Sequence, residues 1–482
     1  MTEGAVTLFS AGEAAGIIGA ACRGNLEAGI GSVTVDSRKA VPDSLFVALP
    51  GERVDGHDYI EAALAGGAKT ILAAEAQKEK ALRAFSSSAI FAAGACLILA
   101  DSPLRGLQAL AREHRRRLKN LLRIGVTGSS GKTTTKECIA AALRPSYPSG
   151  ALAMNEGNLN SDIGLSLSMF GLGKNHAVGV FEMGMNRRGE MEELAAIYEP
   201  DMVVVTNIGT AHIGIIGSRE GIAAEKKKAF SRFDGPQTAF VWDEDPFKDF
   251  LALSVPGRFV QFGLRSGNGL ERAEALGLRG WDIVWKGQRF IFPLPGRHNL
   301  LNGLAALAVA SELGLDPSLT AQGLSSVRPL FGRSELLTGR IELLKDCYNA
   351  NPDSMAAAIE LCDSAQPRAR RVYVLGSMLE LGDESQAAHQ ALGRRAAESK
   401  ADALFFFGEE AEASYLAAKA LRPGAGKKLF HTDSMEELYR QVHAYLQDGD
   451  LLLLKASRGL ALELLAYRLV EAGFAEETHH AS

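Results

Sequence analysis

The chain has 482 residues, of which 46% are hydrophobic and 23% charged, and its formal net charge is −5. This composition is typical of a globular protein in water, and a slightly acidic chain is not expected to bind nucleic acid through bulk charge. A single hydrophobic core stops growing near about 250–300 residues, so the length predicts about three domains.

The cysteines and the apolar segments favour a cytoplasmic protein. The five cysteines are scattered and none belongs to a CxxC pair, which argues against a disulfide framework or a zinc site. No basic residue precedes the first apolar stretch, so we expect no signal peptide. The longest uncharged apolar run, 89–100, is too short to cross a bilayer, and we expect a buried strand there and no membrane insertion.

The first region, residues 1–101, is predicted to be a small α/β domain. Strand-like stretches occupy 32–38, 45–49 and 69–74, and a helical pattern closed by glycines occupies 57–68. A charged helical stretch then leads into the next region.

The second region, residues 102–333, alternates between strands and helices. Its expected strands include 123–128, 177–184 and 201–207. Its expected helices are 132–143, 189–198, 220–230 and 299–315. Such alternation predicts a mainly parallel sheet with helices on both faces.

The third region, residues 334–482, has the same character. Apolar strands at 372–376, 403–408 and 450–457 are separated by alanine-rich helices. We therefore predict a separate Rossmann-like domain, and α/β as the class of the whole chain.

A glycine-rich turn between the first strand and first helix of the second region is predicted to bind phosphate. Gly128 and Gly131 allow backbone N–H groups to face an anion at the start of a helix. Lys132 can reach the β- and γ-phosphates of a nucleotide, and the Thr133 hydroxyl can ligate Mg²⁺. The strict P-loop spacing is missed by one position, because Val126 stands where the first glycine is expected.

Two more chemical groups are expected at the same edge of the sheet. Glu182 ends the next apolar strand, and His212 follows the one after it. The alternatives are a surface carboxylate in a turn and a structural histidine. Lys226, Lys227 and Lys228 lie on a predicted helix, where a solvated basic face is the ordinary interpretation.

These motifs belong to a longer series that runs through most of the chain in a fixed order. The series comprises 36–60, 127–137, 155–164, 182–191, 206–213, 294–310, 346–360, 374–385 and 451–459. In this series the chain resembles the Mur ligase family, the ATP-dependent enzymes that add amino acids in peptidoglycan synthesis. Members of the family use a shortened G-x-x-G-K-[ST] loop, which residues 128–133 match.

The resemblance implies a task for each domain and a reaction. Residues 1–101 would bind a UDP-linked substrate, 102–333 would bind ATP, and 334–482 would close on them. The motifs are most similar to those of the member that joins D-alanyl-D-alanine to UDP-N-acetylmuramoyl-tripeptide through an acyl phosphate, with ATP and Mg²⁺. We expect a cytoplasmic monomer.

The resemblance also implies site residues. The catalytic groups would be Lys132, His212, Lys226 and Arg340. The ATP contacts would be Gly128, Ser129, Ser130, Gly131, Lys132, Thr133, Thr134, Asn302, Arg340 and Asp346. The Mg²⁺ ligands would be Thr133, Glu182, His212 and Lys226, the last as the carbamate found in several members. The substrate contacts would be Ser37, Arg38, Asn158, Asn160, Asn349 and Asn351.

Three alternatives stay open on the sequence. One is a related ligase that adds the third amino acid, but its Asp-Asn-Pro-Arg motif is replaced here by 349–354, which contains no arginine. The second is a ligase that adds glutamate to a folate, which does not explain the motifs of the first domain. The third is a P-loop NTPase switch, which needs no domain for a uridine nucleotide.

Overall fold

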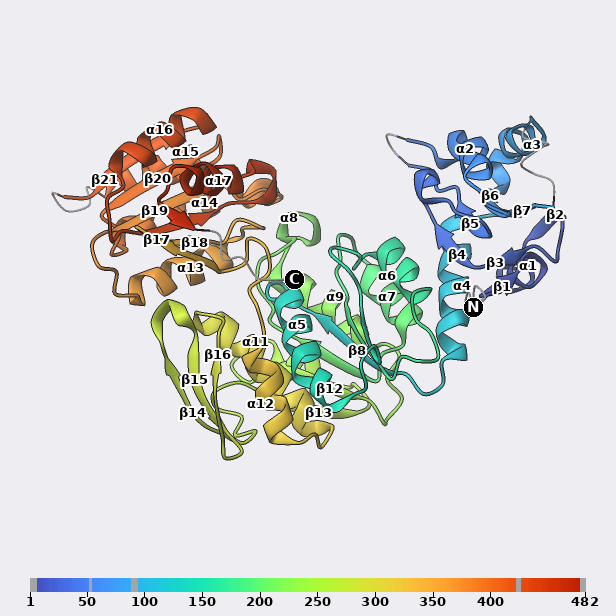
Figure 1. Cartoon of the computed structure of the whole chain (residues 1–482), viewed down its shortest axis with the longest axis horizontal. Helices are drawn as coiled ribbons and strands as arrows, with labels where there is room; N and C mark the ends of the chain where they lie inside the picture. The colour runs from blue at the N-terminus through green and yellow to red at the C-terminus, as the bar shows by residue number, and fades with distance from the viewer. Residues whose placement is uncertain (1–6, 52–53, 88–93, 422–425, 477–482) are drawn as a thin grey trace.

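The computed structural model describes residues 7–51, 54–87, 94–421 and 426–476. Three α/β domains follow one another, and the middle domain lies between the N-terminal and C-terminal ones (Figure 1). The predicted fold class is confirmed. The predicted boundaries after residues 101 and 333 fall just before helix α4 (Pro103–Arg117) and strand β17 (Glu335–Gly339), and they stay predictions.

The N-terminal domain has a five-stranded sheet with the order β2-β7-β6-β5-β4, in which only β2 is antiparallel to its neighbour. The strands are β1 (Phe9–Ser10), β2 (Ala21–Gly24), β3 (Gly29–Ile30), β4 (Ser32–Thr34), β5 (Ser44–Val47), β6 (Thr70–Ala74) and β7 (Cys96–Ala100). The helices are α1 (Ala11–Ile18), α2 (Ile60–Ala65), α3 (Lys78–Ser87) and α4. Of the run 89–100, the strand β7 takes the last part, and 89–93 lie outside the described residues.

The middle domain has a six-stranded, wholly parallel sheet with the order β13-β12-β11-β8-β10-β9. These strands are β8 (Leu122–Thr127), β9 (Leu152–Met154), β10 (Val178–Glu182), β11 (Met202–Val205), β12 (Thr238–Trp242) and β13 (Arg258–Phe262). The helices are α5 (Lys132–Leu143), α6 (Asp162–Met169), α7 (Glu190–Tyr198), α8 (Ile213–Ile216), α9 (Arg219–Lys227), α10 (Lys248–Ala252), α11 (Arg297–Glu312) and α12 (Pro317–Ser325).

A second, antiparallel sheet in the middle domain was not predicted. It is formed by β14 (Leu270–Ala275), β15 (Trp281–Trp285) and β16 (Gln288–Phe292). The sequence of strand β14 contains no apolar run, and most of its side chains are exposed. Its pairing therefore depends on partners that follow later in the chain.

The C-terminal domain has a seven-stranded sheet with the order β21-β20-β19-β22-β18-β17-β23, in which only β17 runs opposite to the other strands and pairs antiparallel with β18 and β23. Besides β17, the strands are β18 (Glu342–Lys345), β19 (Arg371–Gly376), β20 (Ala403–Phe407), β21 (Lys428–Thr432), β22 (Leu451–Lys455) and β23 (Ala475–Glu476). The helices are α13 (Pro352–Ser364), α14 (Ser385–Glu398), α15 (Ala411–Ala420), α16 (Met435–Tyr445) and α17 (Glu463–Glu471).

The three mainly parallel sheets have a buried core cluster on each face, as their continuous apolar strands predict. Successive side chains of a strand point to opposite faces. In β11, Val204 belongs to one core cluster, and Val203 and Val205 belong to another on the opposite face. In β22, Leu451 and Leu453 alternate in the same way with the leucines between them.

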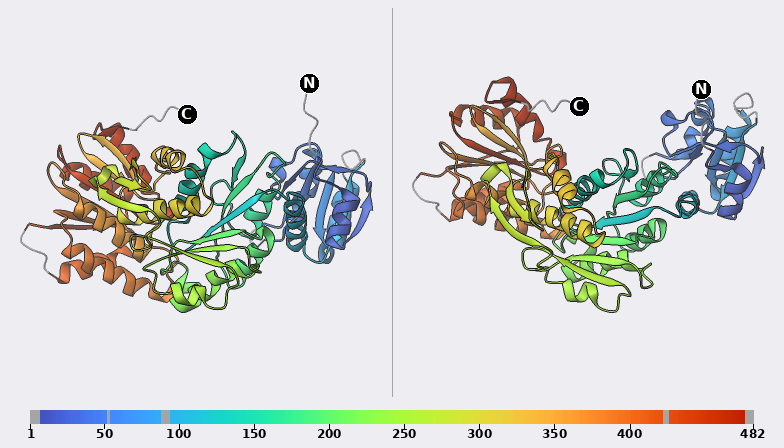
Figure 2. Two further views of the ribbon diagram at one scale, coloured as in Figure 1. Left: turned by 90° about the horizontal axis from the view of Figure 1, so that it is seen from below. Right: turned by 60° about the horizontal axis from the view of Figure 1, so that its bottom comes forward.

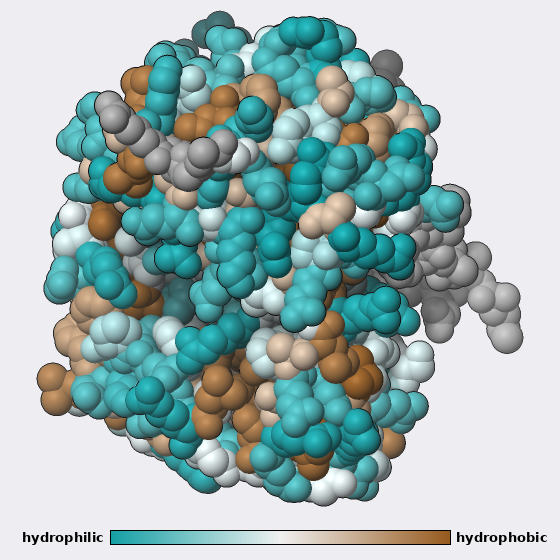
Figure 3. Space-filling view, turned by 90° about the vertical axis from the view of Figure 1, so that its left-hand side faces the viewer, coloured by the Kyte–Doolittle hydropathy of each residue, from teal (hydrophilic) through white to brown (hydrophobic). Residues whose placement is uncertain are grey.

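The face of the molecule shown in Figure 3 is mostly hydrophilic, and its hydrophobic side chains form small scattered groups. Among the described residues, no helix combines the length and apolar character needed to span a bilayer.

The order of the middle sheet determines where chemistry can occur. Strand β8 lies between β10 and β11, with Val126 beside Glu182 and Thr127 beside Val205. The loops that follow these three parallel strands therefore meet at one edge of the sheet. The C-terminal domain approaches the middle domain on the side away from the N-terminal domain (Figure 2).

Candidate active site

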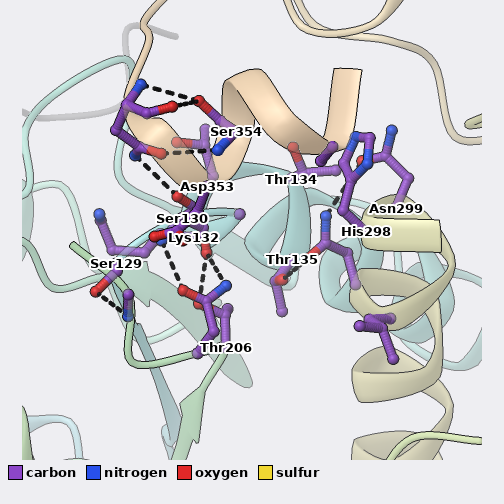
Figure 4. Close-up of a pocket in the computed structure, with 18 of the residues that line it drawn as sticks. Ser129, Ser130, Lys132, Thr134, Thr135, Thr206, His298, Asn299, Asp353 and Ser354 are labelled. Atoms are coloured by element: carbon purple, nitrogen blue, oxygen red, sulfur yellow. Dashed lines mark hydrogen bonds between the residues drawn. The ribbon is translucent and has the colours of Figure 1, made fainter. Parts of the chain in front are cut away.

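A large cavity, of about 980 Å³, lies between the middle and C-terminal domains. Its walls include residues 129–135 after β8, Glu182 at the end of β10 and residues 206–209 after β11. The C-terminal domain contributes the segment from Asp346 to Ser354. Figure 4 shows the first turn of α13 facing the glycine-rich loop across this space.

The glycine-rich loop has the backbone that phosphate binding needs. Gly128 and Gly131 have φ values of 146° and 81°, which L side chains rarely adopt. A Cβ atom on Gly128 would lie 1.8 Å from Thr206 Oγ1, so the loop also requires glycine for space. Helix α5 begins at Lys132, so its free N–H groups and its positive dipole end face the cavity.

Residues that directly follow the neighbouring strand β11 hold the loop in shape. The Thr206 hydroxyl donates to the Ser130 carbonyl (2.6 Å), and the Asn207 carbonyl accepts from the Ser129 N–H (3.0 Å). The Lys132 ammonium donates to the Gly128 carbonyl (3.1 Å). Such a loop is a preorganised cradle for the phosphates of ATP.

Oxygen groups suited to Mg²⁺ lie beside this cradle. The Thr133 hydroxyl donates to Glu182 Oε2 (2.7 Å), and Asn160 Nδ2 donates to Glu182 Oε1 (2.7 Å). The described residues contain no cluster of three or more His, Cys, Asp or Glu side chains gathered for a metal ion. One carboxylate and one hydroxyl still fit Mg²⁺, which takes few protein ligands and completes its shell with phosphate oxygens and water.

Lys226 is the single member of the lysine cluster that faces the cradle. Its side chain is 1% exposed and its ammonium donates to the Gly128 carbonyl (2.9 Å). Burial lowers its pKa well below the ordinary value, and the nearby charge of Lys132 adds to the effect. Lys227 instead caps the carbonyls of Phe250 and Leu253 at 2.7 and 2.6 Å.

His212 occupies an unusual backbone position at the start of α8. Its φ is 65°, in the left-handed region that a non-glycine residue rarely adopts. Burial lowers the pKa of its imidazole to about 4, and the charges of Lys132 and Lys226 contribute. The ring is therefore neutral near pH 7, the form that can ligate a metal.

The residues expected around the nucleoside line the same cavity. Asn302 Oδ1 accepts from the Thr135 hydroxyl (3.0 Å) and lies close against Gly131. Asp346 pairs with Lys455 (2.7 Å) and accepts the Ser334 N–H (3.1 Å). Thr134 and Asn302 lie on the middle domain and Asp346 on the C-terminal domain, so a nucleotide between them would touch both.

The four expected substrate asparagines of these two domains are also in the cavity wall. Asn158 accepts a hydrogen bond from the Tyr348 hydroxyl, and Asn351 Nδ2 donates to Ser130 Oγ (3.1 Å). The Asn349 carbonyl accepts from Lys455 (3.2 Å). The structure thus brings Asn158, Asn160, Asn349 and Asn351 together with the phosphate cradle.

The expectation for Arg340 is corrected by the structure. Arg340 pairs with Asp448 (2.8 Å) and stacks on Phe474, and it is absent from the cavity wall. It precedes β18, whereas Asp346 follows that strand, so about 20 Å of rigid sheet separates Arg340 from the site.

Arg333 is the arginine that lines the cavity instead. Its guanidinium lies 4.0 Å from the centre of the Tyr348 ring. Burial lowers the pKa of the Lys132 ammonium, and the positive charge of Arg333 lowers it further. The sequence carries one signal for Arg333, which is the last residue before the predicted domain boundary. His298, Lys455 and Asp353 also line the cavity without having been predicted.

Ser37 and Arg38 lie apart from this cavity, on the N-terminal domain. They form the 3-10 turn η1 (Ser37–Lys39), which is capped by Asp36. The exposed guanidinium of Arg38 donates to both Asp36 oxygens (2.9 and 2.8 Å) and holds the pKa of that carboxyl at about 2. A substrate that contacts Arg38 and the cavity together would have to extend across two domains.

Family comparisons agree with this three-part organisation. Residues 29–115 match the Mur ligase family, catalytic domain; 126–310 match the Mur ligase middle domain; and 332–458 match the Mur ligase, glutamate ligase domain. These matches follow the order of the three domains along the chain.

Individual proteins match over nearly the full length. UDP-N-acetylmuramoyl-tripeptide–D-alanyl-D-alanine ligase of Treponema pallidum is 41% identical over 91% of this chain and 93% of its own. The enzyme of the same name from Bacillus subtilis is 33% identical over 92% and 94%.

Solved structures give the same result in three dimensions. MurF from Acinetobacter baumannii superposes with a TM-score of 0.84 at 27% identity, over 96% of this chain and 99% of that one. MurF ligase from Thermotoga maritima, solved in complex with ADP, gives 0.77 at 26% identity, over 92% and 97%. By sequence and by fold, the chain belongs to the Mur ligase family.

Proposed function

We infer that this protein joins D-alanyl-D-alanine to UDP-N-acetylmuramoyl-tripeptide, the two substrates in the names of its relatives, and that it consumes ATP in doing so. The observation that supports this most directly is a single cavity lined by the phosphate cradle of the middle domain and by the asparagine-rich segment 349–351 of the C-terminal domain. A site for ATP and a site for a small polar substrate are thus adjacent.

The reaction needs ATP because a carboxylate has no usable leaving group. Transfer of the γ-phosphoryl group to the tripeptide carboxylate gives an acyl phosphate and ADP. The free amine of D-alanyl-D-alanine then attacks the acyl carbon, and phosphate leaves as the amide forms and the amine loses a proton. The protein has little acid or base chemistry to perform, so positioning and charge neutralisation dominate.

The residues of the cavity suit these tasks. Lys132 and Arg333 are cations beside the expected phosphate position, and the Gly128–Gly131 loop supplies N–H donors. Thr133, Glu182 and His212 would hold Mg²⁺, which when bound neutralises phosphate charge. The C-terminal domain forms one wall of the cavity, and its closure on the substrates would limit hydrolysis of an acyl phosphate by water.

We propose that the enzyme works as a monomer in the cytoplasm. Its five cysteines are all free thiols, four of them buried, as expected in a reducing compartment. Light scattering measures the mass in solution.

The test is amine-dependent ADP release. The purified protein is given ATP, Mg²⁺ and UDP-N-acetylmuramoyl-tripeptide, with or without D-alanyl-D-alanine, and ADP and the coupled product are measured. We expect both to require the dipeptide. ADP release that ignores the dipeptide would indicate an NTPase switch, and release with a single amino acid would indicate a different ligase.

A further inference from the structure

One short segment of the C-terminal domain touches three loops of the middle domain. Tyr348 contacts Asn158, and Asn351 contacts Ser130 of the phosphate loop. Asp353 Oδ2 accepts both the backbone N–H of Thr210 (2.9 Å) and its hydroxyl (3.0 Å). The first two contacts involve residues already expected in the site, whereas the third has no role in the reaction described above.

The contact between Asp353 and Thr210 is closely fitted. Asp353 lies in the first turn of α13, which is fixed by a capping box between Asn351 and Ser354. A Cβ atom on Gly209 would lie 2.4 Å from Asp353 Oδ2, so the loop can approach this carboxylate only with glycine there. Figure 4 shows Asp353 directed from α13 toward the middle domain.

Thr210 begins the turn that contains His212. The Thr210 carbonyl accepts the N–H of Ile213 (3.1 Å), and His212 lies between them with its φ of 65°. A non-glycine residue in this region costs of order 1 kcal/mol or more and persists only where neighbours hold it. The bond that fixes Thr210 therefore helps to fix the His212 backbone.

The middle domain holds the start of this loop by hydrogen bonds, and it holds the far end because Ile213 and Ile216 pack in its core. Asp245 accepts the Ile208 N–H (2.8 Å), and Ser129 Oγ accepts the Gly209 N–H (2.9 Å). Beyond Gly209, the C-terminal domain adds contacts on both sides of His212, and on the near side Asp353 holds Thr210.

On the far side, helix α8 packs on the 3-10 turn η7 (Gly382–Glu384). A Cβ atom on Gly214 would lie 3.0 Å from the Gly382 nitrogen, so the two backbones are in direct contact. Arg188 adds a bond from the middle domain to the Ile216 carbonyl (2.6 Å), at the end of α8.

We propose that Asp353 is a positioning residue that sets the His212 turn when the C-terminal domain lies against the middle domain. The ligand set for Mg²⁺ is then complete only in the closed molecule, which couples domain closure to metal use. This inference rests on the proposed function, in which His212 is a Mg²⁺ ligand.

The experiment compares Asp353→Ala, Asp353→Asn and Thr210→Val with the unchanged protein. Asp353→Asn keeps an acceptor oxygen, and Thr210→Val keeps the backbone N–H but removes the hydroxyl. Asp433→Ala removes an exposed carboxylate of the same domain and is the matched control. Two quantities are measured: hydrogen exchange of residues 207–213, and the Mg²⁺ concentration that gives half-maximal amine-dependent ADP release.

We expect Asp353→Ala to exchange faster at 207–213 and to need about 10–100-fold more Mg²⁺, the usual cost of losing a group that orients a metal ligand. Asp353→Asn should recover most of both values, Thr210→Val should lie between, and ATP affinity without Mg²⁺ should stay unchanged. The double variant Asp353→Ala/Thr210→Val should be no worse than Asp353→Ala.

Three outcomes overturn the inference. Faster exchange with an unchanged Mg²⁺ requirement would make the contact structural only. A raised KM for D-alanyl-D-alanine alone would make Asp353 a substrate contact. Variants equal to the unchanged protein in both measurements would leave Asp353 without the role. Failure of the proposed function is distinct, since the unchanged protein would then show no amine-dependent ADP release.

Discussion

Two ammonium groups, one on the half-buried Lys132 and one on the buried Lys226, share one acceptor oxygen in this site. Lys132 and Lys226 both donate to the Gly128 carbonyl, at 3.1 and 2.9 Å. Burial and their mutual repulsion lower the pKa of Lys226, which favours its neutral amine. A neutral amine is the form that attacks CO₂ to give a carbamate, and the resulting anion would be able to ligate Mg²⁺.

We predict that Lys226→Ala loses most of the amine-dependent ADP release, and that Lys226→Glu recovers part of it because a carboxylate resembles the carbamate. Lys227→Ala and Lys228→Ala should stay close to the unchanged protein, since Lys227 caps a neighbouring loop and Lys228 pairs with Glu225. Steady-state rates of the four variants decide the matter. Full activity of Lys226→Ala, or a dead Lys228→Ala, would contradict the assignment.

The two candidate arginines give an equally direct comparison. Arg333→Ala should reduce kcat by about 10²-fold or more, because it removes a cation aimed at developing phosphate charge. Arg340→Ala should remain within about twofold, because it removes an exposed ion pair with Asp448 and a contact with Phe474, both away from the cavity. If the two effects are reversed in a kcat assay, the arrangement of the cavity described here is wrong.

At the scale of the element, the turn between β8 and α5 depends on its own backbone and on the neighbouring strand. Gly128 has a positive φ and no room for a side chain beside Thr206, whereas Gly150 has a φ of 78° with open space around it. These two glycines therefore separate the cost of backbone conformation from the cost of a clash.

We predict that Gly128→Ala weakens ATP binding at least 10-fold, because the loop must move away from Thr206 and its N–H donors turn with it. Gly150→Ala has the backbone cost alone and should leave ATP affinity within about twofold, with a small loss of stability. Calorimetric titration with ATP and thermal unfolding measure both. Equal affinities for the two variants would show that the close approach to Thr206 is unimportant.

At the scale of the whole molecule, the N-terminal domain stands apart from the cavity. The middle domain separates it from the C-terminal domain (Figure 1). Its contribution to the reaction must therefore come through a long substrate that reaches from one domain to the next. Ser37 and Arg38 are our candidates for the uridine diphosphate end.

Arg38→Ala should weaken binding of the UDP-linked substrate, because a cation that can face a diphosphate is lost, and should leave ATP affinity nearly unchanged. Lys39→Ala is the matched control, since it removes the neighbouring exposed cation. Separate titrations with UDP-N-acetylmuramoyl-tripeptide and with ATP distinguish the outcomes. A loss of ATP affinity without a loss of affinity for the UDP-linked substrate would contradict the task given to this domain.

The sequence by itself determined the α/β class, the strand–turn–helix setting of the phosphate loop and the family. Apolar strands such as 178–182 and the glycine–lysine turn at 128–133 report local requirements, which neighbouring residues satisfy. The residues named after β8, β10 and β11 could be placed at one edge because parallel strands end together.

Tertiary structure decided what depends on distant partners. It placed Arg333 rather than Arg340 in the cavity, because the two lie at opposite ends of strand β17. It turned Lys226 inward and Lys227 outward, and it paired the exposed strand β14 with β15. It also brought Asp353 to Thr210 across 143 residues of chain. No periodicity encodes such contacts, because they arise only when one domain packs against another.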